Sequence, residues 1–245
     1  MTDDRGDVSY QSLIDEALFR PVRNGNAFED TVARLLQTIR LGIVAPGEAL
    51  PSERDLAVRF SVSRDTVRDA IKELAAAGYL VSRRGRYGGT FVTEHLPPHS
   101  HAVPIRLDPL EIDDVLGLRQ ILEIGAARSA ARRTLTASER DSLWSHLKEC
   151  SAAGEDDYRR LDSRLHLAIA ELAGVPSLVT LVADSRSRLN DLLDRIPLLA
   201  PNIAHSNQQH EAIVVAVLRG DEAAAADAMF EHLGGSAALL RGFLA

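Results

Sequence analysis

The sequence contains a single cysteine among its 245 residues. No disulfide can form within the chain, so the composition suits a reducing compartment, and Cys150 is expected only to fill space in a core. The N-terminal segment is acidic and lacks the apolar stretch of a signal peptide, and no apolar run approaches the roughly 18 residues that span a bilayer. We therefore expect a cytoplasmic protein without membrane association.

The sequence also lacks internal repeats and low-complexity tracts, and its 45% apolar and 26% charged residues are typical of a globular protein of two modest domains. The net charge of −7 is unevenly distributed: residues 28–93 carry ten basic and eight acidic side chains, whereas residues 108–245 carry fourteen and twenty-one. Positive potential is thus concentrated in residues 28–93. The negative net charge of the whole chain therefore does not exclude a polyanionic partner that binds this region.

Residues 46–92 carry the pattern of two short capped helices followed by a basic hairpin. Ser52 is a capping residue that opens a helix ending near Phe60, and Ser63 opens a second helix that stops at Gly78. The second helix has one apolar stripe at i, i+3, i+4 and i+7 spacing, formed by Val67, Ala70, Ile71 and Leu74. With this stripe in the core, Arg64, Arg68 and Lys72 form a basic ridge on another face.

A wing follows the second helix. The segments 79–81 and 90–92 read as strands, and the turn between them carries three arginines and a pair of glycines: Arg83, Arg84, Arg86, Gly88 and Gly89. A solvated helix face and a surface hairpin would explain each part separately. Their direct succession favours a winged helix-turn-helix, whose second helix enters the major groove of DNA.

This segment resembles the GntR superfamily of bacterial transcription regulators. The signature PGE.LPSER.LA....VSR.TVR.A...L...G.L....G.GTFV is matched at nearly every position over residues 28–93. The resemblance implies binding to double-stranded operator DNA, with contacts from Arg54, Ser63, Arg64, Thr66, Arg68 and Gly89. Asp65 is less favourable there, because phosphate repels a carboxylate.

The domain division follows from this assignment. Residues 1–27 form an N-terminal tail to which the sequence assigns no role, and residues 28–93 form the DNA-binding domain. Residues 94–107 form a linker rich in proline, and residues 108–245 form a helical domain. The last region reads as an all-α bundle of about six helices, so the fold class is mainly α. The expected helices are 109–133, 137–153, 155–173, 177–196, 202–219 and 221–241, and the expected core residues are Leu116, Ile121, Leu122, Leu161, Leu165, Ile169, Ile213, Val217 and Leu218.

Four polar residues of the bundle suggest a metal site. Asp162 and His166 stand four residues apart and share a helix face, and His210 and His232 lie on two later helices with apolar neighbours. Three imidazoles and a carboxylate suit a divalent metal ion, zinc first, with nickel or manganese possible. An isolated Asp–His pair is more often an ordinary surface pair.

Other residues bear on this site. His205 faces another side of its helix, and His146 has no matching partner. Ligation by His232 is the least secure, because Gly234 and Gly235 should weaken the last helix at roughly 1 kcal/mol per glycine.

The bundle resembles the FCD ligand-binding domain of the FadR subfamily over about residues 108–240, where a D...H pair and single histidines on two later helices bind a metal. The stretch LRQILEIGAARSAA, residues 118–131, matches the first-helix signature of that family. By this resemblance Arg119 faces a ligand cavity, although an ion pair with Glu123 would also explain it. The implied protein is a homodimeric repressor that responds to a small organic acid.

Two other function classes remain open. A zinc ion with three histidines could generate hydroxide for hydrolysis, although no HExxH or GxSxG motif is present. A purely architectural DNA-binding protein would make no use of a buried polar cavity.

Overall fold

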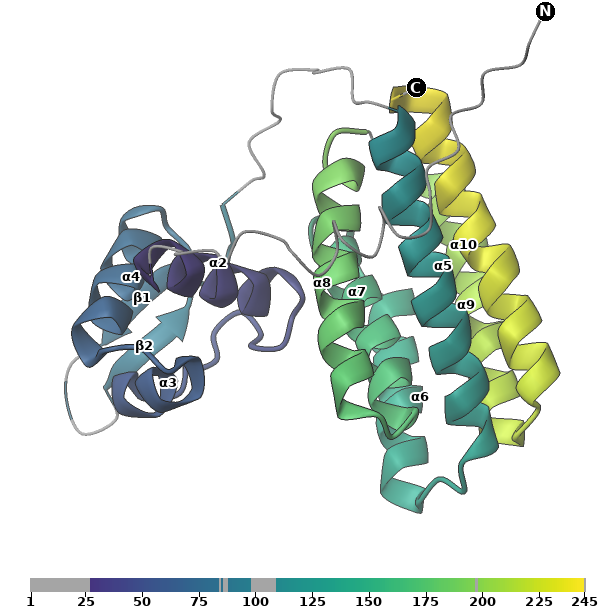
Figure 1. Cartoon of the computed structure of the whole chain (residues 1–245), viewed down its shortest axis with the longest axis horizontal. Coiled ribbons are helices and arrows are strands. Elements are labelled where there is room, and N and C mark those ends of the chain that lie inside the picture. The colour runs from purple at the N-terminus through teal and green to yellow at the C-terminus, as the bar shows by residue number, and fades with distance from the viewer. Residues whose placement is uncertain (1–26, 84, 86–87, 98–108, 197, 245) are drawn as a thin grey trace, which may run out of the picture.

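The computed structural model describes residues 27–83, 85, 88–97, 109–196 and 198–244. Figure 1 shows two units, and within the described residues the N-terminal unit has three helices and a hairpin and the C-terminal unit is a bundle of six long helices. This arrangement confirms the expected fold class. The expected tail 1–27 and linker 94–107 fall largely outside the described residues.

Local capping explains the helices of the N-terminal unit. Ser52 caps α3 (Glu53–Phe60), with its hydroxyl accepting from the Asp55 backbone N–H at 3.2 Å. Ser63 caps α4 (Arg64–Ala76) in the same way, accepting from the Thr66 N–H at 3.0 Å. Gly78 follows α4 with φ of 84°, a backbone conformation that favours glycine. The helix limits expected from the two serines are confirmed.

The remaining elements enclose the small core of this unit. Helix α2 (Ala27–Arg40), which the sequence pattern did not single out, packs against α4. Strands β1 (Leu80–Arg83) and β2 (Gly89–Val92) form an antiparallel hairpin in which Leu80 pairs with Val92. The apolar stripe of α4 is buried as expected, together with residues of the other elements: Leu35, Ile39, Leu56, Val67, Ala70, Ile71, Leu74, Leu80 and Val92.

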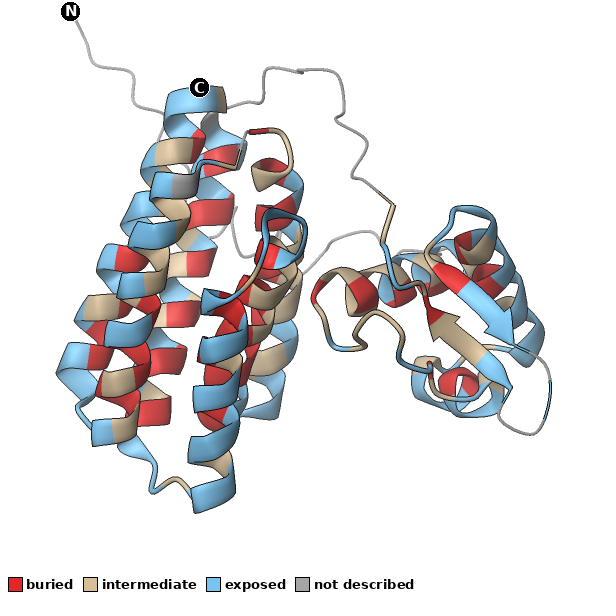
Figure 2. Ribbon diagram, turned by 180° about the vertical axis from the view of Figure 1, so that it is seen from behind, coloured by how far each residue is buried: buried red, intermediate tan, exposed pale blue. Residues whose placement is uncertain are grey.

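The C-terminal bundle has helices close to those expected: α5 (Pro109–Arg132), α6 (Ala137–Ser151), α7 (Glu155–Leu172), α8 (Pro176–Leu193), α9 (Ala200–Arg219) and α10 (Glu222–Leu244). Thr136 and Glu139 form a capping box at the start of α6, and Gly220 ends α9 with φ of 76°. Buried residues face the interior of the bundle (Figure 2).

One expectation for the bundle was wrong. Ile121 is 75% exposed and lies outside the core. Because Arg119 and Glu123 are both buried, the residue midway between them must lie on the opposite face of α5. The glycines Gly234 and Gly235 lie inside α10, which continues through them to Leu244, as the expected helix 221–241 did.

Among the described residues, no helix is long and apolar enough to cross a membrane.

Candidate functional site

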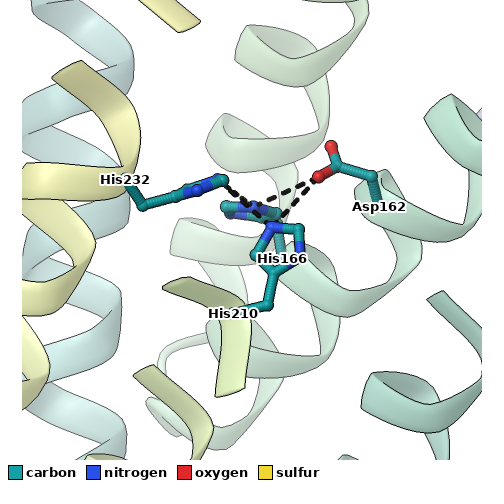
Figure 3. Close-up of side chains that lie close together, drawn as sticks. All are labelled: Asp162, His166, His210 and His232. Atoms are coloured by element: carbon teal, nitrogen blue, oxygen red, sulfur yellow. Dashed lines mark hydrogen bonds and ion pairs between the residues drawn. The ribbon is translucent and has the colours of Figure 1, made fainter. Parts of the chain in front are cut away.

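The four residues proposed as metal ligands lie together in the centre of the bundle. Asp162 and His166 come from α7, His210 from α9 and His232 from α10, and all four are buried (Figure 3). Their candidate ligand atoms lie within 4.8 Å of one another. The structure thus brings together residues that are up to 70 positions apart in the sequence.

The spacing of these atoms suits a single metal ion. His232 Nε2 lies 3.2 Å from both His166 Nε2 and His210 Nε2, and Asp162 Oδ1 lies 3.2 Å from His210 Nε2 and 3.8 Å from His166 Nε2. Four ligands at about 2.0–2.1 Å from a tetrahedral metal are separated by roughly 3.3 Å. The donor set and its spacing therefore fit a divalent cation.

The outer ring nitrogens of the three histidines have partners of their own. His166 Nδ1 lies 2.5 Å from Glu123 Oε2, His232 Nδ1 lies 3.3 Å from Gln209 Oε1, and His210 Nδ1 lies 3.9 Å from Cys150 Sγ. An acceptor at Nδ1 favours the tautomer whose Nε2 lone pair points toward the cluster. Cys150, expected only to fill space, is buried in the core and also contacts this histidine.

Burial keeps the imidazoles of His166 and His232 neutral. It lowers the pKa of His166 to about 4, against the raising effect of Glu123. Burial, together with the neighbouring histidines and Arg119, lowers the pKa of His232 well below its ordinary value. Neutral imidazole is the form that binds a metal, so these two histidines are ready to ligate near neutral pH.

A buried network of charges surrounds the cluster. Arg186 of α8 donates to Asp162 Oδ2 and lies 3.8 Å from Glu123 Oε1. Burial alone would raise the pKa of Asp162, but Arg186 and His210 lower it well below its usual range. Arg119 donates from Nε to Glu123 Oε1 at 3.0 Å and from Nη1 to Ser236 at 2.6 Å.

The sequence analysis missed part of this network. Arg186 was not considered, because a single arginine on an amphipathic helix has no spacing that distinguishes it from a surface residue. Glu123 was seen only as a partner of Arg119, but it also contacts His166. Arg119 pairs with Glu123 and also lines a cavity, while its contact with an effector stays a prediction.

That cavity, of about 80 Å³, adjoins the cluster. Its lining includes two of the ligand candidates, Asp162 and His232, beside Arg119 and residues of α8, α9 and α10. The two histidines set aside in the sequence analysis are not part of the cluster. His205 is exposed on α9, and His146 of α6 lies 3.6 Å from Glu149.

The residues expected to contact DNA lie on the N-terminal unit. Ser63 and Thr66 share a hydrogen bond of 2.8 Å at the start of α4, so their hydroxyls are engaged in capping. Arg68 is exposed and pairs with Asp65 at 2.9 Å and with Glu53 at 3.2 Å. The negative charge of Asp65, which was expected to repel phosphate, is therefore partly neutralised by Arg68.

The remaining expected contacts are accessible. Arg64 is exposed at the start of α4, Arg54 is exposed on α3, and Gly89 is exposed where β2 begins. Arg84 and Arg86 of the expected wing lie outside the described residues.

Comparison with known proteins assigns both units. Residues 28–92 match the model of the gntR family of bacterial regulatory proteins, and residues 114–235 match the FCD domain. The putative L-lactate dehydrogenase operon regulatory protein of Escherichia coli K12 is 30% identical over 224 residues, covering 87% of this chain and 84% of the relative. The chain belongs to the GntR family.

Further similarities agree with this assignment. LutR, an HTH-type transcriptional regulator of Bacillus subtilis, is 30% identical over 217 residues, covering 84% of this chain and 97% of that protein. The solved structure of Escherichia coli McbR/YncC has the same fold, with a TM-score of 0.56 and 17% identity over 89% of this chain and 98% of that one.

The chain is thus a DNA-binding transcriptional regulator with an FCD effector domain, and not an enzyme. The hydrolase considered from the sequence is excluded by this membership.

Proposed function

We propose that this GntR regulator is a homodimeric repressor whose binding to operator DNA is controlled by a small carboxylate at a metal site. The observation that carries the proposal is the convergence of Asp162, His166, His210 and His232 beside a cavity lined by Arg119. An architectural DNA-binding protein would have no use for such a site.

The charges of the site support an anionic effector. The two buried arginines Arg119 and Arg186 match the two buried carboxylates Glu123 and Asp162 in number and opposite charge. A bound divalent metal, zinc first, would supply positive charge, and expansion of its coordination beyond the four protein ligands would admit an oxygen ligand. A carboxylate at this point would offset that charge, with Arg119 within reach of the same cavity.

The name of one relative supports the same class of effector. The similar protein of Escherichia coli K12 is named as a putative regulatory protein of an L-lactate dehydrogenase operon. That name refers to a small organic acid, which supports a carboxylate effector for this chain.

Helix α8 offers a path from this site to the DNA-binding unit. On one side of α8, Arg186 holds Asp162. Elsewhere on the same helix, Asp184 accepts from Arg34 at 3.2 Å and Asp191 accepts from Arg40 at 2.9 Å, both arginines lying on α2. A ligand that shifts Asp162 would change the position of α8, and with it the placement of the winged helix.

The exposed face of α5 supports dimerisation. Leu110, Leu118 and Ile121 are exposed on this helix, within about 80° of one another around its axis. Such a stripe is uncovered in a single chain and suits a second copy. Two winged helices would then contact the halves of a palindromic operator.

The test is operator binding by the full-length protein in three states: metal-free, loaded with Zn²⁺, and loaded with Zn²⁺ in the presence of L-lactate and other small acids. We expect operator affinity to change between these states. Equal affinity in all three would contradict the proposal.

A further inference from the structure

The cavity beside the ligand cluster has a polar end. Three of its lining residues stand one helical turn from a candidate ligand: Tyr158 four positions before Asp162, Ser206 four before His210, and Ser236 four after His232. The guanidinium of Arg119 lies beside these residues, since it donates a hydrogen bond to Ser236. The charged and hydrogen-bonding groups of the cavity therefore lie close to the cluster.

The other end of the cavity is apolar. Ile203 stands seven positions before His210 on α9, and Leu239 stands seven after His232 on the antiparallel α10, so both lie about 10 Å from the cluster in the same direction. The other apolar lining residues come from the end of α8 and the segment after it: Leu189, Leu193, Ile196, Leu198 and Leu199.

Two further polar side chains line the cavity, Arg159 and Asn202. Neither calls for a second anionic group on the bound effector. Arg159 donates to the Ile196 carbonyl at 3.1 Å and pairs with Asp194 through Nε at 3.3 Å. Its charge is thus already balanced by a carboxylate. Asn202 is a neutral amide and attracts no anion in particular.

Accepting the proposed carboxylate site, we infer that the effector is a monocarboxylate with an aliphatic tail. The carboxylate lies at the cluster with Arg119, and the tail lies against the apolar end. A dicarboxylate would bury its second charge against apolar side chains and an arginine that is already paired with Asp194, and a sugar acid would place hydroxyls against the apolar residues. The volume of about 80 Å³ suits a slim chain.

Binding of a homologous series tests the inference. Full-length protein loaded with Zn²⁺ is titrated calorimetrically with acetate, butanoate and hexanoate, and with succinate and D-glucuronate for comparison. Each buried methylene should raise affinity about fourfold, so butanoate and hexanoate should bind more tightly than acetate, succinate and glucuronate. This ratio depends on the apolar end and not on which metal is loaded.

The possible failures are distinguishable. If succinate or glucuronate binds more tightly than butanoate and hexanoate, the aliphatic effector is wrong while the carboxylate site stands. If none of the five acids binds, both the inference and the proposed effector site are wrong.

A substitution at the apolar end provides a second test. Leu199→Asn changes a wall residue that is 39% exposed and occupies the N-cap of α9, where asparagine is a favoured residue. The hexanoate-to-acetate affinity ratio should fall by a factor of about three, as expected from losing part of the apolar contact. Leu181→Asn, at an exposed position of α8 away from the cavity, is the matched control. An unchanged ratio in Leu199→Asn would overturn the inference.

Discussion

Asp194, directly after α8, accepts a hydrogen bond from Arg40 of α2 at 2.6 Å. The same carboxylate lies 3.3 Å from Arg159, which lines the effector cavity. One acidic side chain therefore contacts both the cavity wall and the DNA-binding unit. Movement of Arg159 on effector binding would reach α2 through this contact.

Arg40→Ala should weaken the effector response more than it weakens DNA binding. The ion pair is partly buried, so its loss should remove coupling between the units, whereas Arg40 does not belong to the proposed DNA surface. The measurement is operator affinity with and without effector. Arg188→Ala is the matched control, because the exposed Arg188–Asp114 pair also involves α8 but joins it to α5 and not to α2. Equal responses in wild type and Arg40→Ala would exclude this path.

Arg68→Ala should lower operator affinity by more than about 1 kcal/mol if α4 reads the major groove. Arg68 is exposed on α4, and its pairs with Glu53 and Asp65 orient the guanidinium on that surface. Fluorescence anisotropy with labelled operator measures the loss. Arg128→Ala, an exposed arginine of α5, should leave affinity unchanged and controls for net charge. Unaltered binding by the Arg68 variant would remove α4 from the interface.

Salt should weaken operator binding with a linear relation between log affinity and log salt concentration. Phosphate contacts release counterions, so the slope reports the number of phosphates neutralised by α4 and the hairpin. A titration from low to high salt measures it. A flat response would argue against contact through these cations.

Glu123→Gln should lower metal affinity roughly 10- to 100-fold, because the carboxylate orients His166 through Nδ1. The substitution also leaves Arg119 without its buried ionic partner and removes one of the two carboxylates near Arg186, which should destabilise the metal-free protein by about 3 kcal/mol or more. Competition with a zinc chelator and chemical denaturation give the two quantities. Wild-type metal affinity in a folded variant would show that Glu123 does not position the ligand.

Local sequence signals were sufficient for the helix ends and for half of the metal cluster. Ser52 and Ser63 cap their own helices through contacts three residues away, and Asp162 and His166 share a face because of helical periodicity. His210 was assigned to the same site because apolar residues flank it on a later helix, and the family resemblance agreed. Its actual approach to the cluster depends on how α7 and α9 pack, which no local pattern fixes.

The errors and omissions arise from the same limit. Ile121 was placed in the core because it is apolar, yet the buried ion pair of Arg119 and Glu123 turns it outward. Arg186 belongs to the buried network only because α8 packs beside α7.

The most direct test of the metal-centred account is the metal content of purified protein, measured by elemental analysis. Wild type, and the control variants His205→Ala and His146→Ala, should carry bound divalent metal. The double variant His166→Ala/His210→Ala should carry none and should respond to no carboxylate, because two of the four converging ligands are gone. A double variant that retains both its metal and its effector response would contradict the account.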